Sequence, residues 1–235
     1  MMRVLVTGGA SGLGAAVVAA VQADGGTPIV LDRTAPLPGA PSEPAAENVP
    51  EHIVVDLSDR EAAESAVREA ADRLGGLDAV VTCAGTDACG KLEDIPGKDW
   101  DRVIAVNLLG TAAVVRAALP SLVESHGKVV TVASTLGLRA LSDATAYCAS
   151  KFGVVGFTRA LQVEMQGKVG VTMLVPGGMS TAFFDDRDPQ YKPGDDAQLN
   201  DPANVAAAAL FALKQPPGCE VRELLITPST EPSWP

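Results

Sequence analysis

The sequence predicts a doubly wound α/β fold, in which a mostly parallel β-sheet carries helices on both faces. Short apolar runs rich in valine and isoleucine recur along the chain, and segments with helical periodicity separate them. Continuous apolar runs, unlike alternating ones, are typical of strands covered on both faces. A regular alternation of strand and helix indicates right-handed βαβ crossovers and hence a parallel sheet.

The individual elements follow from these two patterns. Strands are expected at residues 3–6, 28–31, 52–55, 79–82, 128–132, 171–175 and 224–227. Helices are expected at residues 12–24, 60–74, 100–124, 144–166 and 204–215. Strand and helix thus alternate almost to the end of the chain, which is the order of a Rossmann-type sandwich.

Length and composition favour one domain. The chain has 235 residues, of which 47% are hydrophobic and 20% charged. This length is typical of a single compact domain over residues 1–235, and the apolar content is large enough to form its core.

Two connections depart from the regular alternation. Residues 34–50 are rich in Pro, Ala and Glu without helical periodicity, which predicts a long, flexible surface loop. Residues 182–201, rich in Asp, Pro and Gly from residue 185 onward, predict a substrate-side loop that can close over a ligand.

The charge balance narrows the class of partner. The formal net charge is −11, and there is no long run of lysine or arginine. This argues against a surface for nucleic acid or an anionic membrane and favours a small soluble molecule. The apolar stretch at residues 4–6 is interrupted by Thr7, Gly8 and Gly9 before it reaches the length of a signal-peptide core or a membrane span. A cytoplasmic location is therefore expected.

The cysteines and histidines do not form a metal-binding or disulfide pattern. Cys83, Cys89, Cys148 and Cys219 include no C-x-x-C pair, and His52 and His126 lie far apart in the sequence. We expect reduced cysteines in or near the core and no metal site.

A glycine-rich turn follows the first strand and leads into the first helix. Its glycines are Gly8, Gly12 and Gly14, with Ser11 and Leu13 between them. Glycines permit positive φ and let the backbone approach a pyrophosphate, whose charge meets free N–H groups and the positive end of the helix dipole. The turn therefore predicts a dinucleotide site, with an ordinary tight turn as the alternative.

The end of the second strand bears on the choice of dinucleotide. A carboxylate at Asp32 can accept the ribose hydroxyls of an adenosine and would repel a 2′-phosphate, so NAD(H) is favoured. Arg33 follows directly and can pair with a phosphate, which keeps NADP(H) as an alternative. Asp56 and Leu57, at the end of the third strand, are expected to flank the adenine, although an aspartate here is also a common helix cap.

Tyr147 and Lys151 lie four residues apart in a segment with helical periodicity, so their side chains project from one face. The ammonium is expected to lower the pKa of the phenol from its free value of about 10, so that the tyrosine can exchange a proton near neutral pH. A solvent-facing pair on a helix is the alternative.

Two further polar residues accompany this pair. Ser134 stands just past the strand at residues 128–132, at the carboxyl edge of the sheet where open α/β folds bind ligands; an ordinary cap or turn serine is the alternative. Asn107 lies inside a long apolar helix, an unfavourable place for an amide unless its hydrogen bonds are used. The alternative for Asn107 is an exposed or locally bonded side chain.

Together these residues resemble the short-chain dehydrogenase/reductase family. The resemblance rests on Thr7-Gly8-x-x-x-Gly12-x-Gly14, Asp56, Ala84-Gly85, Asn107, Ser134, Tyr147-x-x-x-Lys151 and Pro176-Gly177, in the family's order and spacing. It runs from residue 3 to about residue 181. The resemblance implies a single Rossmann domain, a nicotinamide cofactor and an Asn-Ser-Tyr-Lys catalytic set.

The resemblance also implies a role for each member of that set. Tyr147 would be the general acid/base, and Lys151 would lower its pKa and hold the nicotinamide ribose. Ser134 would hydrogen-bond the substrate oxygen, and Asn107 would help hold a water-linked proton relay through Lys151.

The same resemblance extends to the cofactor site. Ala84 and Gly85 belong to the family's segment after the fourth strand. The segment from Pro176 and Gly177 to Thr181 resembles the one that contacts the nicotinamide carboxamide. Within it, Thr181 and the backbone near Gly178 and Met179 are expected at the carboxamide.

The chain departs from the family pattern in three places. Thr82-Cys83-Ala84-Gly85 stands where many members carry Asn-Asn-Ala-Gly, which removes an expected hydrogen bond within the sheet. The region after residue 181 is short and has few bulky apolar residues, which predicts a shallow or open substrate pocket. Residues 222–228 replace the glycine-rich ending common in tetrameric members.

The sequence thus predicts an NAD(H)-dependent oxidoreductase that interconverts a secondary alcohol and a ketone. A non-catalytic dinucleotide-binding sensor or scaffold, and the same chemistry with NADP(H), are the alternatives. The expected helices at residues 100–124 and 144–166 are apolar over more than one face. Because the family pairs these helices across a two-fold axis, a homodimer or homotetramer is expected.

Overall fold

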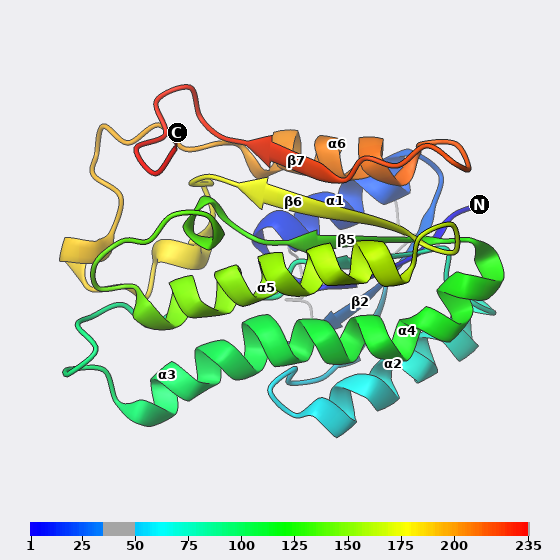
Figure 1. The fold of residues 1–235 in the computed structure, drawn as a ribbon, viewed down its shortest axis with the longest axis horizontal. Coiled ribbons are helices and arrows are strands. Elements are labelled where there is room, and N and C mark those ends of the chain that lie inside the picture. Colours follow the sequence, from blue (N-terminus) through cyan, green and yellow to red (C-terminus); the bar gives the residue numbers. More distant parts are fainter. Residues whose placement is uncertain (35–49, 235) are drawn as a thin grey trace.

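The computed structural model describes residues 1–34 and 50–234, which form a parallel sheet covered by helices on both faces (Figure 1). The sheet has the order β3-β2-β1-β4-β5-β6-β7, and every neighbouring pair is parallel. The strands are β1 (Arg3–Thr7), β2 (Thr27–Asp32), β3 (Glu51–Val54), β4 (Ala79–Thr82), β5 (Lys128–Val132), β6 (Gly170–Pro176) and β7 (Glu223–Ile226). The predicted fold class is confirmed, and the sheet is wholly rather than mostly parallel. The loop predicted at residues 34–50 lies outside the described residues except at its two ends.

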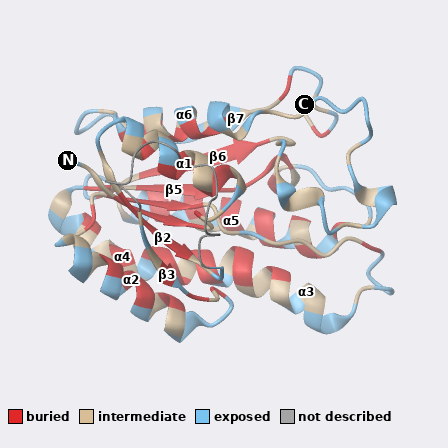
Figure 2. Cartoon of the chain, turned by 180° about the vertical axis from the view of Figure 1, so that it is seen from behind, coloured by how far each residue is buried: buried red, intermediate tan, exposed pale blue. Residues whose placement is uncertain are grey.

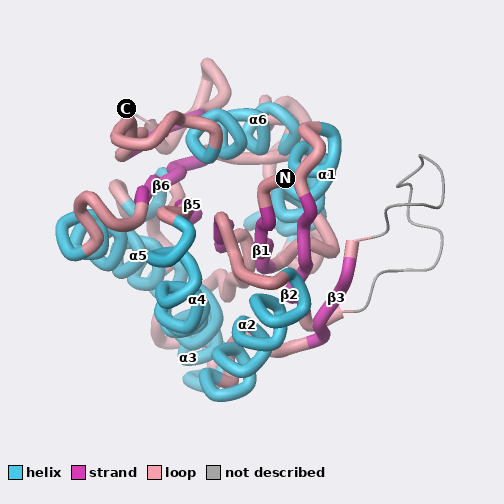
Figure 3. The backbone as a smooth tube through the Cα atoms, turned by 90° about the vertical axis from the view of Figure 1, so that its right-hand side faces the viewer, coloured by secondary structure: helices cyan, strands magenta, loops and turns pink. Residues whose placement is uncertain are grey.

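The helices divide into two layers (Figure 3). They are α1 (Gly12–Ala23), α2 (Arg60–Leu74), α3 (Gly97–Ile104), α4 (Thr111–Ser125), α5 (Thr145–Glu164) and α6 (Pro202–Leu213). Helices α1 and α6 pack together on one face of the sheet, and α2, α4 and α5 contribute to the core on the other.

The five inner strands, β1, β2, β4, β5 and β6, contribute to both of these cores because successive side chains point to opposite faces. In β1, Val4 and Val6 pack against α1 and α6, whereas Leu5 joins the core under α2 and α4. All three side chains are fully buried, and burial of a side chain of this size contributes about 1.5–3 kcal/mol. This two-sided burial explains the continuous apolar runs of the sequence, and Figure 2 shows the buried sheet between helices with exposed outer faces.

Helix ends carry the expected local signals. The Asp59 carboxylate caps α2 by accepting a hydrogen bond from the Ala62 amide at 3.0 Å, and Gly75 ends the helix at φ 67°. Asp201 caps α6 in the same way through the Ala203 amide, with Pro202 as the first helical residue.

The helix predicted at residues 100–124 begins earlier and is not uniform. The helical stretch runs over Gly97–Ser125, and its middle, Ala105–Gly110, is a π-helix that contains Asn107. A wider turn of this kind commonly occurs at functional sites. By length and composition, Gly97–Ser125 is also the one helix of the described chain apolar enough to cross a membrane, with a mean hydropathy of 1.7. Half of its most apolar window is buried in the protein, where it packs against α2 and α5.

The strand order positions the site. The chain runs from β1 to β2 and β3 on one side of β1 and then crosses back to β4 on its other side, so the strand order reverses there. Ligands of open α/β folds bind outside the carboxyl ends of the strands at such a reversal. The glycine turn after β1, Ser134 after β5 and the segment after β6 all lie at this edge of the sheet.

Candidate functional site

The turn between β1 and α1 brings the backbone into close contact with its neighbours. Gly8 and Gly12 have positive φ values of 68° and 51°. A Cβ on Gly8 would lie 2.8 Å from backbone atoms of Ala84, and a Cβ on Gly14 would overlap the Gly8 carbonyl. The three glycines are therefore required by this turn, as the sequence predicts.

The start of α1 has the chemistry of an anion site. Ser11 is the N-cap, and its side chain makes no capping hydrogen bond within the described chain. The first turn of α1 has no acidic side chain that would occupy the positive end of the helix dipole or repel a bound anion. The N–H groups of this turn, including that of Leu13, therefore fit the pyrophosphate of a dinucleotide.

Asp32 ties the end of β2 to the glycine turn. Its Oδ2 accepts a hydrogen bond from the Ala10 amide at 3.0 Å, and its Oδ1 accepts from the amide and hydroxyl of Thr34 at 3.1 and 3.0 Å. Arg33, beside it, is exposed. A half-buried carboxylate at this place is able to accept hydrogen bonds from ribose hydroxyls and opposes a phosphate.

Asp56 and Leu57 differ in how they face the site. The pKa of Asp56 is lowered, first by the Ser58 amide and also by Arg102, whose guanidinium donates to Oδ2 at 3.2 Å. Asp56 thus lies in a turn with its charge compensated. The Leu57 side chain is buried in the core beneath α2, so only its backbone remains available near the site.

Tyr147 and Lys151 come together on α5. The Lys151 side chain is 5% exposed, and its Nζ lies 5.6 Å from the centre of the Tyr147 ring and donates to the Val132 carbonyl at 2.9 Å. Ser134 lies close enough to the Tyr147 phenol to lower its pKa. The solvent-facing alternative for the pair is wrong, because the ammonium is buried. The cap alternative for Ser134 also holds, since its Oγ accepts from the Leu136 amide at 3.1 Å.

Asn107 is buried and its amide is fully used. Its Oδ1 accepts from the Thr86 amide at 2.8 Å, and its Nδ2 donates to the Thr86 carbonyl at 2.9 Å and to Ser150 Oγ at 3.0 Å. The position of a Cβ on Gly85 would be 3.5 Å from Asn107 Oδ1 and 3.9 Å from Lys151 Nζ. The π-helical turn therefore places Asn107 against the segment after β4 and beside Lys151.

The electrostatics of the pair differ from the sequence-based expectation. Burial raises the pKa of Tyr147 above its ordinary value, and Asp87 raises it further, whereas Ser134 and Arg187 lower it. Burial lowers the pKa of Lys151 to about 8. The predicted lowering of the phenol pKa is wrong in this structure, because desolvation outweighs the favourable contacts. At neutral pH the phenol is protonated and is a proton donor.

The segment after β6 lies beside the glycine turn. Pro176 ends β6, and the Gly177 amide donates to the Ile226 carbonyl at 2.9 Å. Met179 pairs with Asn200 and packs against the core under α1 and α6. A Cβ on Gly12 would be 3.4 Å from Thr181 Cγ2, so Thr181 faces the β1–α1 turn.

The change from the family's Asn-Asn-Ala-Gly is visible after β4. Cys83 is half-buried, and burial raises the pKa of its thiol to about 12. The Ala84 amide donates to Thr7 Oγ1 at 3.1 Å. The buried Thr82 hydroxyl has no hydrogen-bond partner in the described chain.

Sequence reasoning missed a group of side chains beside Tyr147. The Phe183 ring lies 5.8 Å from the Tyr147 ring, and the Arg187 guanidinium lies 5.1 Å from Phe183 and 4.6 Å from Phe184. Arg187 Nη2 donates to Asp87 Oδ2 at 2.6 Å, and both side chains are largely buried. The two partners are 100 residues apart in loops without periodicity, so no sequence signal connects them.

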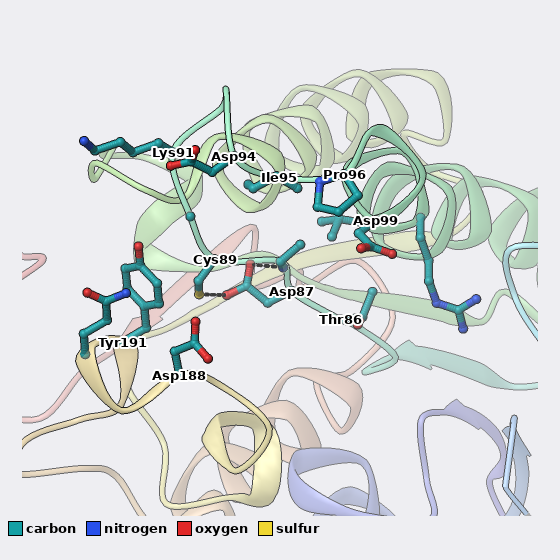
Figure 4. Close-up of a pocket in the computed structure, with 15 residues that line it drawn as sticks. Thr86, Asp87, Cys89, Lys91, Asp94, Ile95, Pro96, Asp99, Asp188 and Tyr191 are labelled. Atoms are coloured by element: carbon teal, nitrogen blue, oxygen red, sulfur yellow. Dashed lines mark hydrogen bonds between the residues drawn. The ribbon is translucent and has the colours of Figure 1, made fainter.

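A cavity of about 490 Å³ adjoins this group (Figure 4). It lies between the segment after β4, the start of α3 and the turn Pro189–Tyr191. Asp87, which lines it, also accepts a hydrogen bond from the Cys89 thiol at 3.2 Å. Asp94, Asp99 and Asp188 also line the cavity, whereas Tyr147 does not. Asp87 therefore lines the cavity and also raises the pKa of Tyr147.

Comparison with known proteins gives consistent matches. A family model described as short chain dehydrogenase matches residues 2–192. An uncharacterized oxidoreductase of Staphylococcus aureus strain MW2 is 31% identical over 226 residues, covering 95% of this chain and 96% of that protein.

Two solved structures have the same fold. One is an alcohol dehydrogenase from the archaeon Thermococcus sibiricus complexed with 5-hydroxy-NADP, with a TM-score of 0.83 and 24% identity over 96% of each chain. The other is a ligand-free aldohexose dehydrogenase of Thermoplasma acidophilum, with a TM-score of 0.84 and 22% identity over 96% of this chain and 92% of that one.

Proposed function

Because the chain belongs to the short-chain dehydrogenase family of oxidoreductases, we propose that it interconverts a secondary alcohol and a ketone with NAD(H) as the hydride carrier. The observation that carries this proposal is the contact between Tyr147 and the buried ammonium of Lys151, with Ser134 close enough to lower the pKa of the phenol. Burying a charged ammonium beside a phenol costs stability, and such a buried titratable pair is typical of groups that act together in proton transfer.

The β1–α1 turn and Asp32 together fit a dinucleotide. The amides at the start of α1 would hold its pyrophosphate, and Asp32 would accept its ribose hydroxyls. When bound, the nicotinamide supplies or accepts the hydride.

The protein's part in the reaction is proton transfer and alignment. In reduction, the protonated Tyr147 hydroxyl donates its proton to the carbonyl oxygen; in oxidation, the phenolate accepts the proton of the alcohol. Ser134 hydrogen-bonds the same oxygen and fixes its position. Lys151, charged below a pH of about 8, stabilises the phenolate that forms when the proton leaves. Asn107 holds the segment after β4 against Lys151.

The choice of NAD(H) rests on Asp32, with NADP(H) as the alternative through Arg33. The Thermococcus sibiricus relative, which shares the fold, was solved with an NADP analogue, so the choice needs a direct test. Asp32→Ala is expected to weaken NADH binding about tenfold and NADPH binding less, because the carboxylate attracts ribose hydroxyls and repels a phosphate. Calorimetric titration of both nucleotides into both proteins measures this. If the variant loses more NADPH affinity than NADH affinity, the assignment is reversed.

A panel of ketones and secondary alcohols, followed by NADH absorbance, tests the activity itself. Turnover of any member with a preference for NADH supports the proposal. Binding of NADH without turnover of any member would instead favour a non-catalytic sensor or scaffold.

We also propose a homodimer or homotetramer acting on small molecules in the cytoplasm, without nucleic-acid or membrane partners. Three large apolar side chains support the assembly: Leu109, Phe152 and Val163 are 55%, 44% and 72% exposed on the helices expected to pair. Light scattering that gives a monomer mass at micromolar concentration would contradict it.

A further inference from the structure

The C-terminal segment, residues 228–234, folds back over the site. Its end lies at the edge of the sheet toward which β6 and β7 point (Figure 1). The Glu231 carboxylate accepts a hydrogen bond from the Gly178 amide at 2.8 Å. The Ser233 hydroxyl is hydrogen-bonded to Thr135 Oγ1 at 2.8 Å and to Glu231 Oε1 at 2.5 Å.

These bonds join two separate walls of the site. Thr135 follows Ser134 directly and opens the short helical turn Thr135–Gly137, for which Ser134 is the cap. Gly178 belongs to the segment after β6. One short connection, Thr135–Ser233–Glu231–Gly178, therefore spans the carboxyl ends of β5 and β6.

Burial and packing indicate that this segment makes a well-packed contact with the rest of the fold. Ser233 is 9% exposed and Thr135 2% exposed. A Cβ on Gly177 would overlap the Glu231 carboxylate, so the glycine leaves room for this contact. Trp234 packs under the Arg139 guanidinium, which lies 5.7 Å from its ring and follows the same helical turn.

We propose that Glu231 and Ser233 are positioning residues, which hold the Ser134 turn and the Gly178 segment at a fixed separation. This inference rests on the proposed function, because Ser134 and the Gly178 segment are assigned there and by family likeness to substrate and cofactor. A hydroxyl that must meet a reacting oxygen loses effectiveness when its support moves by a fraction of an ångström. The C-terminal segment acts through Ser134 and Gly178 and touches neither reactant.

The test compares Ser233→Ala with Ser229→Ala, the same change at an exposed serine of the same segment. The first readout is hydrogen exchange of the protein without added nucleotide, which needs no activity. Ser233→Ala is expected to speed exchange in residues 135–138, and Glu231→Ala is expected to speed it at Gly178 as well, whereas Ser229→Ala leaves both at the wild-type rate.

The second readout is the kinetic split with NADH and the best panel substrate. Loss of one hydrogen bond at the support corresponds to about a threefold to tenfold fall in kcat for Ser233→Ala, with the KM for NADH unchanged. Glu231→Ala is expected to raise the KM for NADH as well, because it frees Gly178. Glu231→Gln restores much of the loss, since an amide oxygen still accepts from the Gly178 amide.

The outcomes separate this inference from the proposed function. If Ser233→Ala exchanges like the wild type in residues 135–138, or retains full kcat, the positioning role is overturned. A fall in thermal stability with unchanged kcat and KM overturns it too, because that is the result of a structural contact alone. If the wild type turns over no substrate, the proposed function fails, and the exchange readout still decides whether the segment holds the two walls.

Discussion

Replacing Lys151 by methionine should make the fold more stable at neutral pH. Burial lowers the pKa of this side chain from its ordinary 10.5 to about 8, so the folded protein releases a proton that the unfolded chain keeps between these values. At pH 7 the buried ammonium therefore costs about 3 kcal/mol, and at pH 10 about 1 kcal/mol. Methionine has a similar length and carries no charge, but it loses the hydrogen bond to the Val132 carbonyl, which is worth about 1 kcal/mol.

The expected net gain in unfolding free energy is thus about 2 kcal/mol at pH 7 and close to zero at pH 10. Urea denaturation of wild type and variant at both pH values, without added nucleotide, measures it. A variant that is less stable than wild type at pH 7, or equally stabilised at both pH values, would refute the reasoning. Activity should be lost in either case, so the wild type keeps this lysine at the expense of stability.

Two further substitutions test the surroundings of the site. Asp87→Asn should lower the pKa of Tyr147, because the Asp87 carboxylate raises this pKa and its removal leaves Arg187 unpaired. Phenolate absorbance can be titrated in a Tyr191→Phe background, where Tyr147 is the remaining tyrosine of the two in the chain. An unchanged titration would contradict the prediction. Gly14→Ala should weaken NADH binding at least about tenfold and destabilise the fold by about 1–3 kcal/mol, because the added Cβ overlaps the Gly8 carbonyl. Calorimetry measures the affinity and thermal unfolding measures the stability. Wild-type affinity would show that the turn tolerates a side chain.

Much of the fold could be predicted because local and tertiary preferences agree. Strands such as β1 are buried on both faces, so their apolar runs are continuous and easily recognised. The glycines of the β1–α1 turn are required by backbone contacts within a few residues of each other and by Ala84. Once the helix is assigned, the four-residue spacing of Tyr147 and Lys151 places their side chains on the same face.

Features that depend on packing between distant segments could not be predicted. The π-helical turn at Asn107 arises where the helix meets the segment after β4, and helical periodicity does not reveal it. Arg187 and Asp87 meet through two loops, as do Glu231 and Gly178. The raised pKa of Tyr147 reflects burial, which one-dimensional spacing to Lys151 does not convey.

The most direct test of proton transfer by Tyr147 is the Tyr147→Phe variant, which removes one hydroxyl from a half-buried ring. We expect NADH to bind with wild-type affinity by calorimetry, while turnover of the best panel substrate falls by at least about a hundredfold, as expected for loss of a general acid. Turnover near the wild-type rate, with the nucleotide still bound, would contradict the assignment of the proton to Tyr147 and with it the proposed reaction.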